Sequence, residues 1–126
     1  VSGTYGKKQG ATAGDYVKAL MLDIDLRPNA QWRLAVDIAC TLFIYIVEGE
    51  GFFDGTFSTR VESHRAVLFG EGDEFSVRSG PKGLRFLLFA GQPLKEPIAW
   101  GGPIVMNTRE ELRQAFAEID NGTFIR

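Results

Sequence analysis

The side chains that most often hold metal ions or act as nucleophiles are scarce in this chain of 126 residues, which has one histidine, His64, and one cysteine, Cys40. A transition-metal site needs several His, Cys or carboxylate ligands that converge on one point. His64 lies in a polar stretch, which is typical of a solvated surface histidine. Cys40 lies in an apolar run, which is typical of a small buried hydrophobic residue. We therefore predict no catalytic residue, no metal ligand and no cofactor in this chain.

Carboxylates and glycines gather at positions that look like strand ends. No calcium-loop spacing occurs among the acidic residues, so we interpret them as charges that solvate loop tips: Glu48, Glu50, Glu71, Asp73 and Glu74. The glycine-rich segments 48–51 and 70–73 are acidic and would repel a phosphate. Segment 101–103 lacks the lysine of a phosphate-binding loop, and no Gly-x-Ser-x-Gly elbow occurs.

Composition excludes further classes of function. The formal net charge is −2 with no basic block, so we expect no direct binding of nucleic acid. The longest apolar run, residues 39–47, is about half the ~20 residues that a membrane helix needs, so no membrane association is expected. A single cysteine permits no internal disulfide and fits a reducing, cytoplasmic location. The chain begins with valine, so we expect a processed or excised piece of a longer protein.

The elements that must carry these residues are mostly short strands. Apolar and polar residues alternate in 19–26 and again in 32–38, the period of a half-buried strand. Residues 42–47 are continuously apolar, and Asp54-Gly55 is a typical hairpin turn. Many short strands separated by turns favour an all-β sandwich or barrel. The candidate interior residues are Leu22, Ile24, Leu34, Val36, Phe43, Tyr45, Phe86 and Leu88.

One amphipathic helix is predicted after Thr108, a candidate N-cap that forms a capping box with Glu111. Four residues at helical spacing form its apolar stripe, which we expect to pack on the barrel: Leu112, Ala115, Phe116 and Ile119. Three parts follow from this pattern. Residues 1–14 form a glycine-rich arm or linker, residues 15–106 a barrel with a proline-rich strap, and residues 107–126 the C-terminal helix.

The stretch 89–124 resembles the C-terminal domain of the pirin family. The shared residues belong to a Gly-x-Pro-Leu-x-Glu-Pro-Ile segment and a Gly-Pro-x-Val-Met-Asn-Thr segment: Gly91, Pro93, Leu94, Glu96, Pro97, Gly101, Pro103, Met106, Asn107 and Thr108. Upstream, Tyr45 to Gly49 is similar to a strand end of cupin barrels. Ile104 departs from the phenylalanine that the family usually has. The resemblance implies a cupin, a small antiparallel β-barrel or double-sheet jelly roll with a C-terminal strap and one α-helix.

The same resemblance implies that iron belongs to an N-terminal cupin that would lie upstream, held there by three histidines and a glutamate. Residues 32–44 and 83–86, where cupin metal ligands would fall, contain no histidine. Two hypotheses remain. The chain is either a non-catalytic structural or protein-binding module, or the silent half of an iron-dependent quercetin 2,3-dioxygenase. Its expected partner is the N-terminal cupin or another protein, with a homo-oligomer as a further option.

Overall fold

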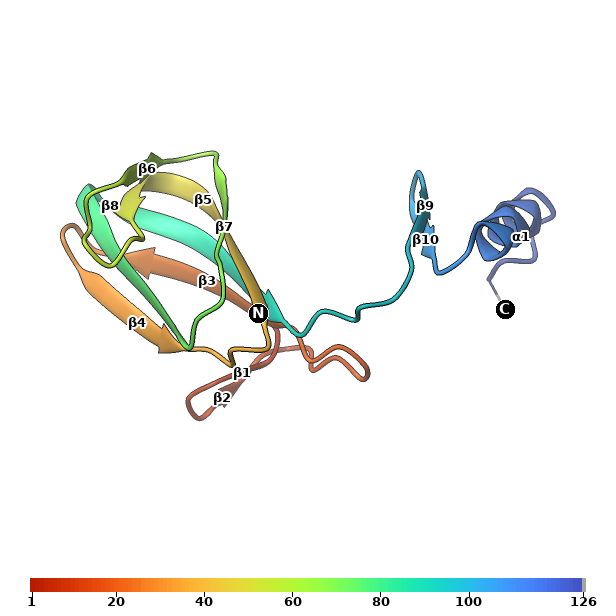
Figure 1. Cartoon of the computed structure of the whole chain (residues 1–126), viewed down its shortest axis with the longest axis horizontal. Helices are drawn as coiled ribbons and strands as arrows, with labels where there is room; N and C mark the ends of the chain where they lie inside the picture. Colours follow the sequence, from red (N-terminus) through yellow and green to blue (C-terminus); the bar gives the residue numbers. More distant parts are fainter. Residues whose placement is uncertain (126) are drawn as a thin grey trace. The chain divides into compact units, whose positions relative to one another are not determined.

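The computed structural model describes residues 1–125, in which ten β-strands precede one α-helix (Figure 1). The elements are β1 (Thr4–Tyr5), β2 (Lys8–Gln9), β3 (Leu20–Leu26), β4 (Gln31–Ala35), β5 (Thr41–Phe52), β6 (Arg60–Glu62), β7 (Ala66–Leu68), β8 (Glu74–Gly91), β9 (Ala99–Gly101), β10 (Ile104–Met106) and α1 (Arg109–Asp120). The expectation of a mostly β chain with one C-terminal helix is confirmed.

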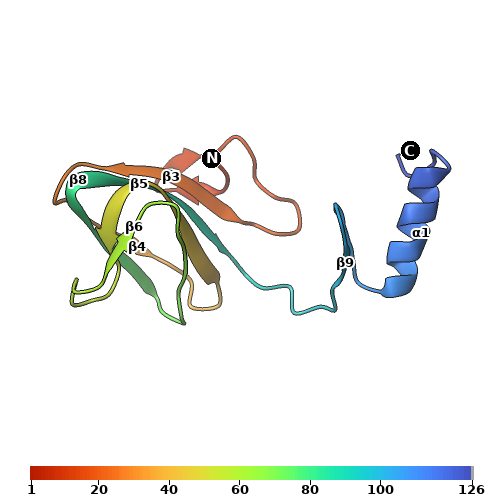
Figure 2. The ribbon, with the colours of Figure 1, turned by 90° about the horizontal axis from the view of Figure 1, so that it is seen from above.

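Two long strands, β5 and β8, organise the main sheet, whose order is β3-β8-β5-β6. All pairs are antiparallel, and β8 bonds to β4 through residues 74–78 and to β3 through residues 84–90. Strand β5 bonds to β8 along most of its length and also to β7. Because both long strands bend, a single sheet curls over its own inner face (Figure 2). We call this the curled sheet.

The inner face carries the core, in which Ile44, Ile46, Phe86 and Leu88 are fully buried. Leu22, Ile24, Leu34 and Val36 pack against it as expected. The placement of Phe43 and Tyr45 in the interior is wrong, because both side chains face outward. The run 42–47 is apolar on both faces, so its pattern does not fix which face turns inward. The pairing of β5 with β8 determines which face turns inward, because it places Ile44 opposite Leu88.

Aromatic rings fill the space between the two sides of the curled sheet. Trp32, Phe53, Phe69, Phe75 and Phe86 contact one another mostly edge to face or tilted, with ring centroids 5.1–6.2 Å apart. Such pairs add about 0.5–1.5 kcal/mol each beyond the area they bury. The aromatic cluster therefore accounts for many of the phenylalanines of the sequence.

The bend of β5 depends on a glycine. The register of β5 against β8 shifts on either side of Gly49, which has φ +78°. A Cβ atom at this position would overlap the backbone carbonyl of Gly83. The close approach of the two strands therefore requires glycine at position 49.

The N-terminal residues 1–14 include a short hairpin, β1 with β2. The hairpin is tied to the curled sheet, because Ser2 and Met21 exchange two backbone hydrogen bonds of 3.0 and 3.1 Å. The expected glycine-rich arm thus contains a small element of its own.

The chain divides into two compact units, Val1–Pro93 and Leu94–Arg126. In the second unit, the β9–β10 hairpin packs on α1 through Gly101, which lies against Leu112 and Phe116. Thr108 caps α1, since its side chain accepts from the Glu111 N–H and its own N–H donates to the Glu111 carboxylate. Ala115 is buried, whereas Phe116 and Ile119 remain 39% and 43% exposed. Among residues 1–125 no helix is long and apolar enough to cross a membrane.

Candidate functional site

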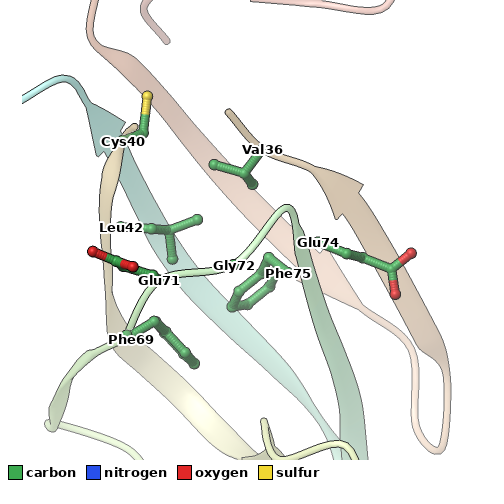
Figure 3. A pocket seen from close by; sticks show the side chains of 9 residues that line it. Val36, Cys40, Leu42, Phe69, Glu71, Gly72, Glu74 and Phe75 are labelled. Carbon is green, nitrogen blue, oxygen red and sulfur yellow. The ribbon is translucent and has the colours of Figure 1, made fainter. Parts of the chain in front are cut away.

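A cavity of about 220 Å³ lies at one end of the curled sheet. We call it the end cavity. Figure 3 shows apolar side chains on both sides of it: Val36 after β4, Leu42 at the start of β5, Phe69 after β7, and Phe75 at the start of β8. Residues 70–72 and Cys40 complete the rim. The walls are thus supplied by four segments that lie far apart in the sequence.

Backbone hydrogen bonds hold these walls together. The Val36 N–H donates to the Asp73 carbonyl at 2.8 Å, and the Phe69 N–H donates to the Leu42 carbonyl at 3.1 Å. These bonds join the segment after β4 to the loop before β8, and the segment after β7 to β5. The end cavity is therefore preformed by the fold.

The polar groups of the end cavity sit at its rim. The carboxylates of Glu71 and Glu74 point away from the space between the strands (Figure 3). Glu74 forms an ion pair with Arg33 at 3.3 Å. Cys40 is half-buried at the rim. The cavity thus combines apolar walls with polar and acidic groups at its rim.

Within residues 1–125, no group of three His, Cys, Asp or Glu side chains comes together in a way that could hold a metal ion. His64 is exposed in a turn with φ +62°, and its N–H donates to the Ile46 carbonyl at 2.8 Å. Iron, which the resemblance assigns to another cupin, therefore does not fit the side chains of residues 1–125.

The outer face of the curled sheet carries a second candidate site. One row of side chains crosses four strands, because Met21 lies opposite Phe89, Phe89 opposite Phe43, and Phe43 opposite Leu68. The rings of Phe43 and Phe89 stack with their centroids 4.7 Å apart and an interplanar angle of 11°. Phe43 is 41% exposed and Leu68 71% exposed. We call these four residues the outer apolar face.

A hollow of about 420 Å³ continues this face toward the N-terminus, where its lining includes Ser2, Ala19 and Gly91. Ser2 contributes to this edge because it is bonded to Met21. An exposed apolar surface of this kind is typical of an interface. The sequence analysis did not predict this site. The run 42–47, which is apolar on both faces, was a signal that both faces of this strand are covered by other residues or by a partner.

Charged groups border the outer apolar face. The Arg85 guanidinium donates two hydrogen bonds, of 2.9 and 3.1 Å, to the Asp23 carboxylate. This contact with Arg85 holds the pKa of Asp23 below its usual value. The Asp23 side chain is exposed to water. The border is thus an ion pair that stays charged at neutral pH.

The predicted family signature begins at Gly91, the last residue of β8, and continues through the segment after β8 into the second unit. Pro93, Leu94, Glu96 and Pro97 are exposed in a segment without regular secondary structure. The Asn107 side chain donates to the Pro97 carbonyl at 3.1 Å. The remaining residues occupy the hairpin and the helix cap: Gly101, Pro103, Met106 and Thr108. The hairpin also presents Trp100 and Val105, which lie opposite each other and are exposed.

Most of the chain is similar to one family of known proteins. Residues 21–125 match the family model of the pirin C-terminal cupin domain. A pirin-like protein of Arabidopsis thaliana is 43% identical over 122 residues, which cover 93% of this chain and 45% of that protein. Human pirin is 38% identical over 104 residues, which cover 81% of this chain and 36% of that protein.

Among solved structures, a quercetin 2,3-dioxygenase from Acinetobacter baumannii matches with a TM-score of 0.86 and 31% identity. That match covers 98% of this chain and 42% of the dioxygenase. The curled sheet therefore has a cupin-like fold. The chain spans less than half the length of each of these proteins.

Proposed function

Since the chain belongs to the pirin family and corresponds to its C-terminal cupin domain, we propose that it acts as a non-catalytic module that packs on another protein domain. Within residues 1–125 no group of side chains could hold a metal ion. A cupin without ligands can still contribute a surface. The proposal therefore rests on the exposed surface of the curled sheet.

The outer apolar face is the observation that carries this proposal. Phe43 and Leu68 leave apolar area in water, at a cost of roughly 25 cal/mol per Å² relative to burial. The stacked pair of Phe43 and Phe89 is the kind of rigid aromatic centre around which interfaces form. A partner that covers this row would remove from water an apolar patch that crosses four strands.

We propose that the partner is an N-terminal cupin domain. In each of these relatives, more than half of the chain lies outside the part that resembles this one. In this arrangement the partner cupin would supply any iron, and this domain would stabilise it through apolar contact.

A second candidate function is the silent half of an iron-dependent quercetin 2,3-dioxygenase. It is favoured by the similarity to the Acinetobacter baumannii enzyme over 98% of this chain. Both candidates use the same contact surface. They differ in whether the assembled protein oxidises flavonols.

A chimera tests the proposal. The matched part of the Acinetobacter baumannii dioxygenase is replaced by this chain, with and without Phe43→Glu. We expect the unsubstituted chimera to be soluble and to melt cooperatively, and Phe43→Glu to lower its melting temperature because a charge is forced into the interface. Tyr16→Glu is the matched control, since Tyr16 is 98% exposed and lies outside the outer apolar face.

Equal melting temperatures for the Phe43→Glu and Tyr16→Glu chimeras would contradict the packing role of this face. Quercetin consumption by the unsubstituted chimera separates the two candidates. Turnover would show that this chain can serve as the silent half of a dioxygenase, and a folded, iron-loaded chimera without turnover would show that it packs on the catalytic half without supporting the reaction.

A further inference from the structure

We propose that the end cavity is a binding site for a small uncharged aromatic molecule of one ring or two fused rings. This site is independent of the packing surface on which the proposed function rests, because the end cavity is lined by the inner and end residues of the curled sheet. The outer apolar face contributes none of the lining residues.

The size of the end cavity limits its ligand. An apolar cavity of about 150 Å³ is sufficient for benzene. Pockets for drug-sized ligands measure about 300–1,000 Å³. At about 220 Å³, the end cavity lies between these values, so a phenol or an indole matches its volume better than the three rings of a flavonol do.

The walls favour an aromatic ligand. Val36 and Leu42 provide aliphatic contact, and the rings of Phe69 and Phe75 stand edge to face, with centroids 5.1 Å apart and an interplanar angle of 86°. An aromatic ligand can continue this edge-to-face arrangement. Cys40 lies at the rim of this space.

The charges select against anions. None of the nine lining residues is Lys, Arg or His, so a carboxylate in the cavity would find no counter-charge among them. Burial of an unpaired carboxylate is costly. Glu71 at the rim adds negative charge to the entrance, whereas the charge of Glu74 is paired with that of Arg33.

The site requires little rearrangement. The backbone bonds from Val36 to Asp73 and from Phe69 to Leu42 already fix the walls. Gly70 and Gly72 border the opening, and a Cβ atom at either position would meet no other heavy atom within 4 Å. Val36, Leu42, Phe69 and Phe75 form the apolar part of the lining, so a ligand that places a ring against them buries apolar surface.

Nuclear magnetic resonance of the full chain tests the proposal, with indole and phenol as probes and benzoate and quercetin as comparisons. We expect indole and phenol to shift the amide signals of residues 36–42 and 69–75 saturably, with a dissociation constant on the order of 1 mM or tighter. Benzoate and quercetin should bind at least tenfold more weakly at these signals. Saturating indole should also slow alkylation of Cys40, the sole cysteine, at least threefold.

Val36→Trp fills the end cavity and should weaken indole binding at least tenfold. Leu68→Trp on the outer apolar face is the matched control and should leave it unchanged. Gly72→Phe fills the opening from the loop and replaces Val36→Trp if that variant does not fold. The proposal is overturned if neither probe shifts these signals, if benzoate or quercetin binds as tightly, or if the folded cavity variants bind indole like the wild type.

Discussion

Leu88 occupies the centre of the core, with no exposed area, opposite Ile44 on β5 and Leu22 on β3. Truncation of such a side chain removes transfer free energy and leaves a cavity. We predict that Leu88→Ala lowers the free energy of unfolding by about 2–5 kcal/mol, measured by urea denaturation. Leu68→Ala is the matched control, since Leu68 is 71% exposed, and should change stability by less than about 0.5 kcal/mol. Equal losses for the two variants would contradict the strand phase described here.

Asp54 organises the loop that follows β5. Its carboxylate accepts hydrogen bonds from the Ser58 hydroxyl at 2.7 Å, the Ser58 N–H at 2.9 Å and the Thr59 N–H at 3.0 Å. The hydrogen bond from the Ser58 side chain is the largest cause that lowers the pKa of Asp54 to about 2. Because the folded pKa lies below the unfolded value of about 3.9, the contribution of Asp54 to stability is present above pH ~4. It is lost as the pH falls toward 2.

We predict that Ser58→Ala raises the pKa of Asp54 toward its ordinary value, measured by titration of the carboxyl carbon signal. Ser76→Ala, on β8, is the matched control and should leave this pKa unchanged. A titration of Asp54 that is identical in the wild type and the Ser58→Ala variant would show that the loop is not held by this contact.

At the scale of residues, sequence could predict which positions are apolar, but not always which of them face inward. Ile24 and Leu34 sit in alternating stretches and were placed correctly. Phe43 and Tyr45 were not, because a run that is apolar on both faces has no period. Their outward direction results from long-range pairing with β8, which no local pattern contains.

The cap of α1 is an element whose prediction from sequence is confirmed in detail. Thr108 and Glu111 exchange their hydrogen bonds at 3.2 and 2.8 Å, and Gly122 follows the helix with φ +70°. Loss of such a cap costs about 1 kcal/mol. We predict that Thr108→Ala increases amide hydrogen exchange in the first turn of α1 about fivefold, with Thr123→Ala as the control beyond the helix. Unchanged exchange in that first turn would contradict the role of the cap.

The strands illustrate both the reach and the limits of prediction at this scale. The alternation in residues 19–26 predicts β3, which begins one residue later, at Leu20. The continuity of β8 over 18 residues was not predicted, because Gly80, Pro81 and Gly83 indicate a turn when only local preference is considered. In the structure these residues lie where the strand bends, and Gly83 has φ +85°. The packing of α1 on the barrel stays a prediction.

For the whole molecule, the absence of histidine from segments 32–44 and 83–86 predicts that the purified chain binds no stoichiometric iron, zinc or copper. Elemental analysis after dialysis checks this, with expected metal contents far below one per chain. One tightly held metal per chain that is lost in a His64→Ala variant would contradict the assignment.

The two candidate sites could not be predicted from the sequence, because each is formed by segments that meet only in the folded chain. The end cavity joins Val36, Leu42, Phe69 and Phe75, which meet only after the sheet curls. The outer apolar face likewise depends on the register of four strands. The family resemblance, by contrast, lies in a continuous stretch of chain and was therefore readable from sequence.

Sedimentation of the purified chain in the micromolar range tests whether the outer apolar face is a packing surface. Without a partner domain to cover Phe43, we predict that the wild-type chain self-associates and that Phe43→Glu sediments as a monomer of 13.9 kDa. Tyr16→Glu should self-associate like the wild type. A wild-type chain that remains a monomer over this range, or a Phe43→Glu chain that associates equally well, would contradict a packing role for this face.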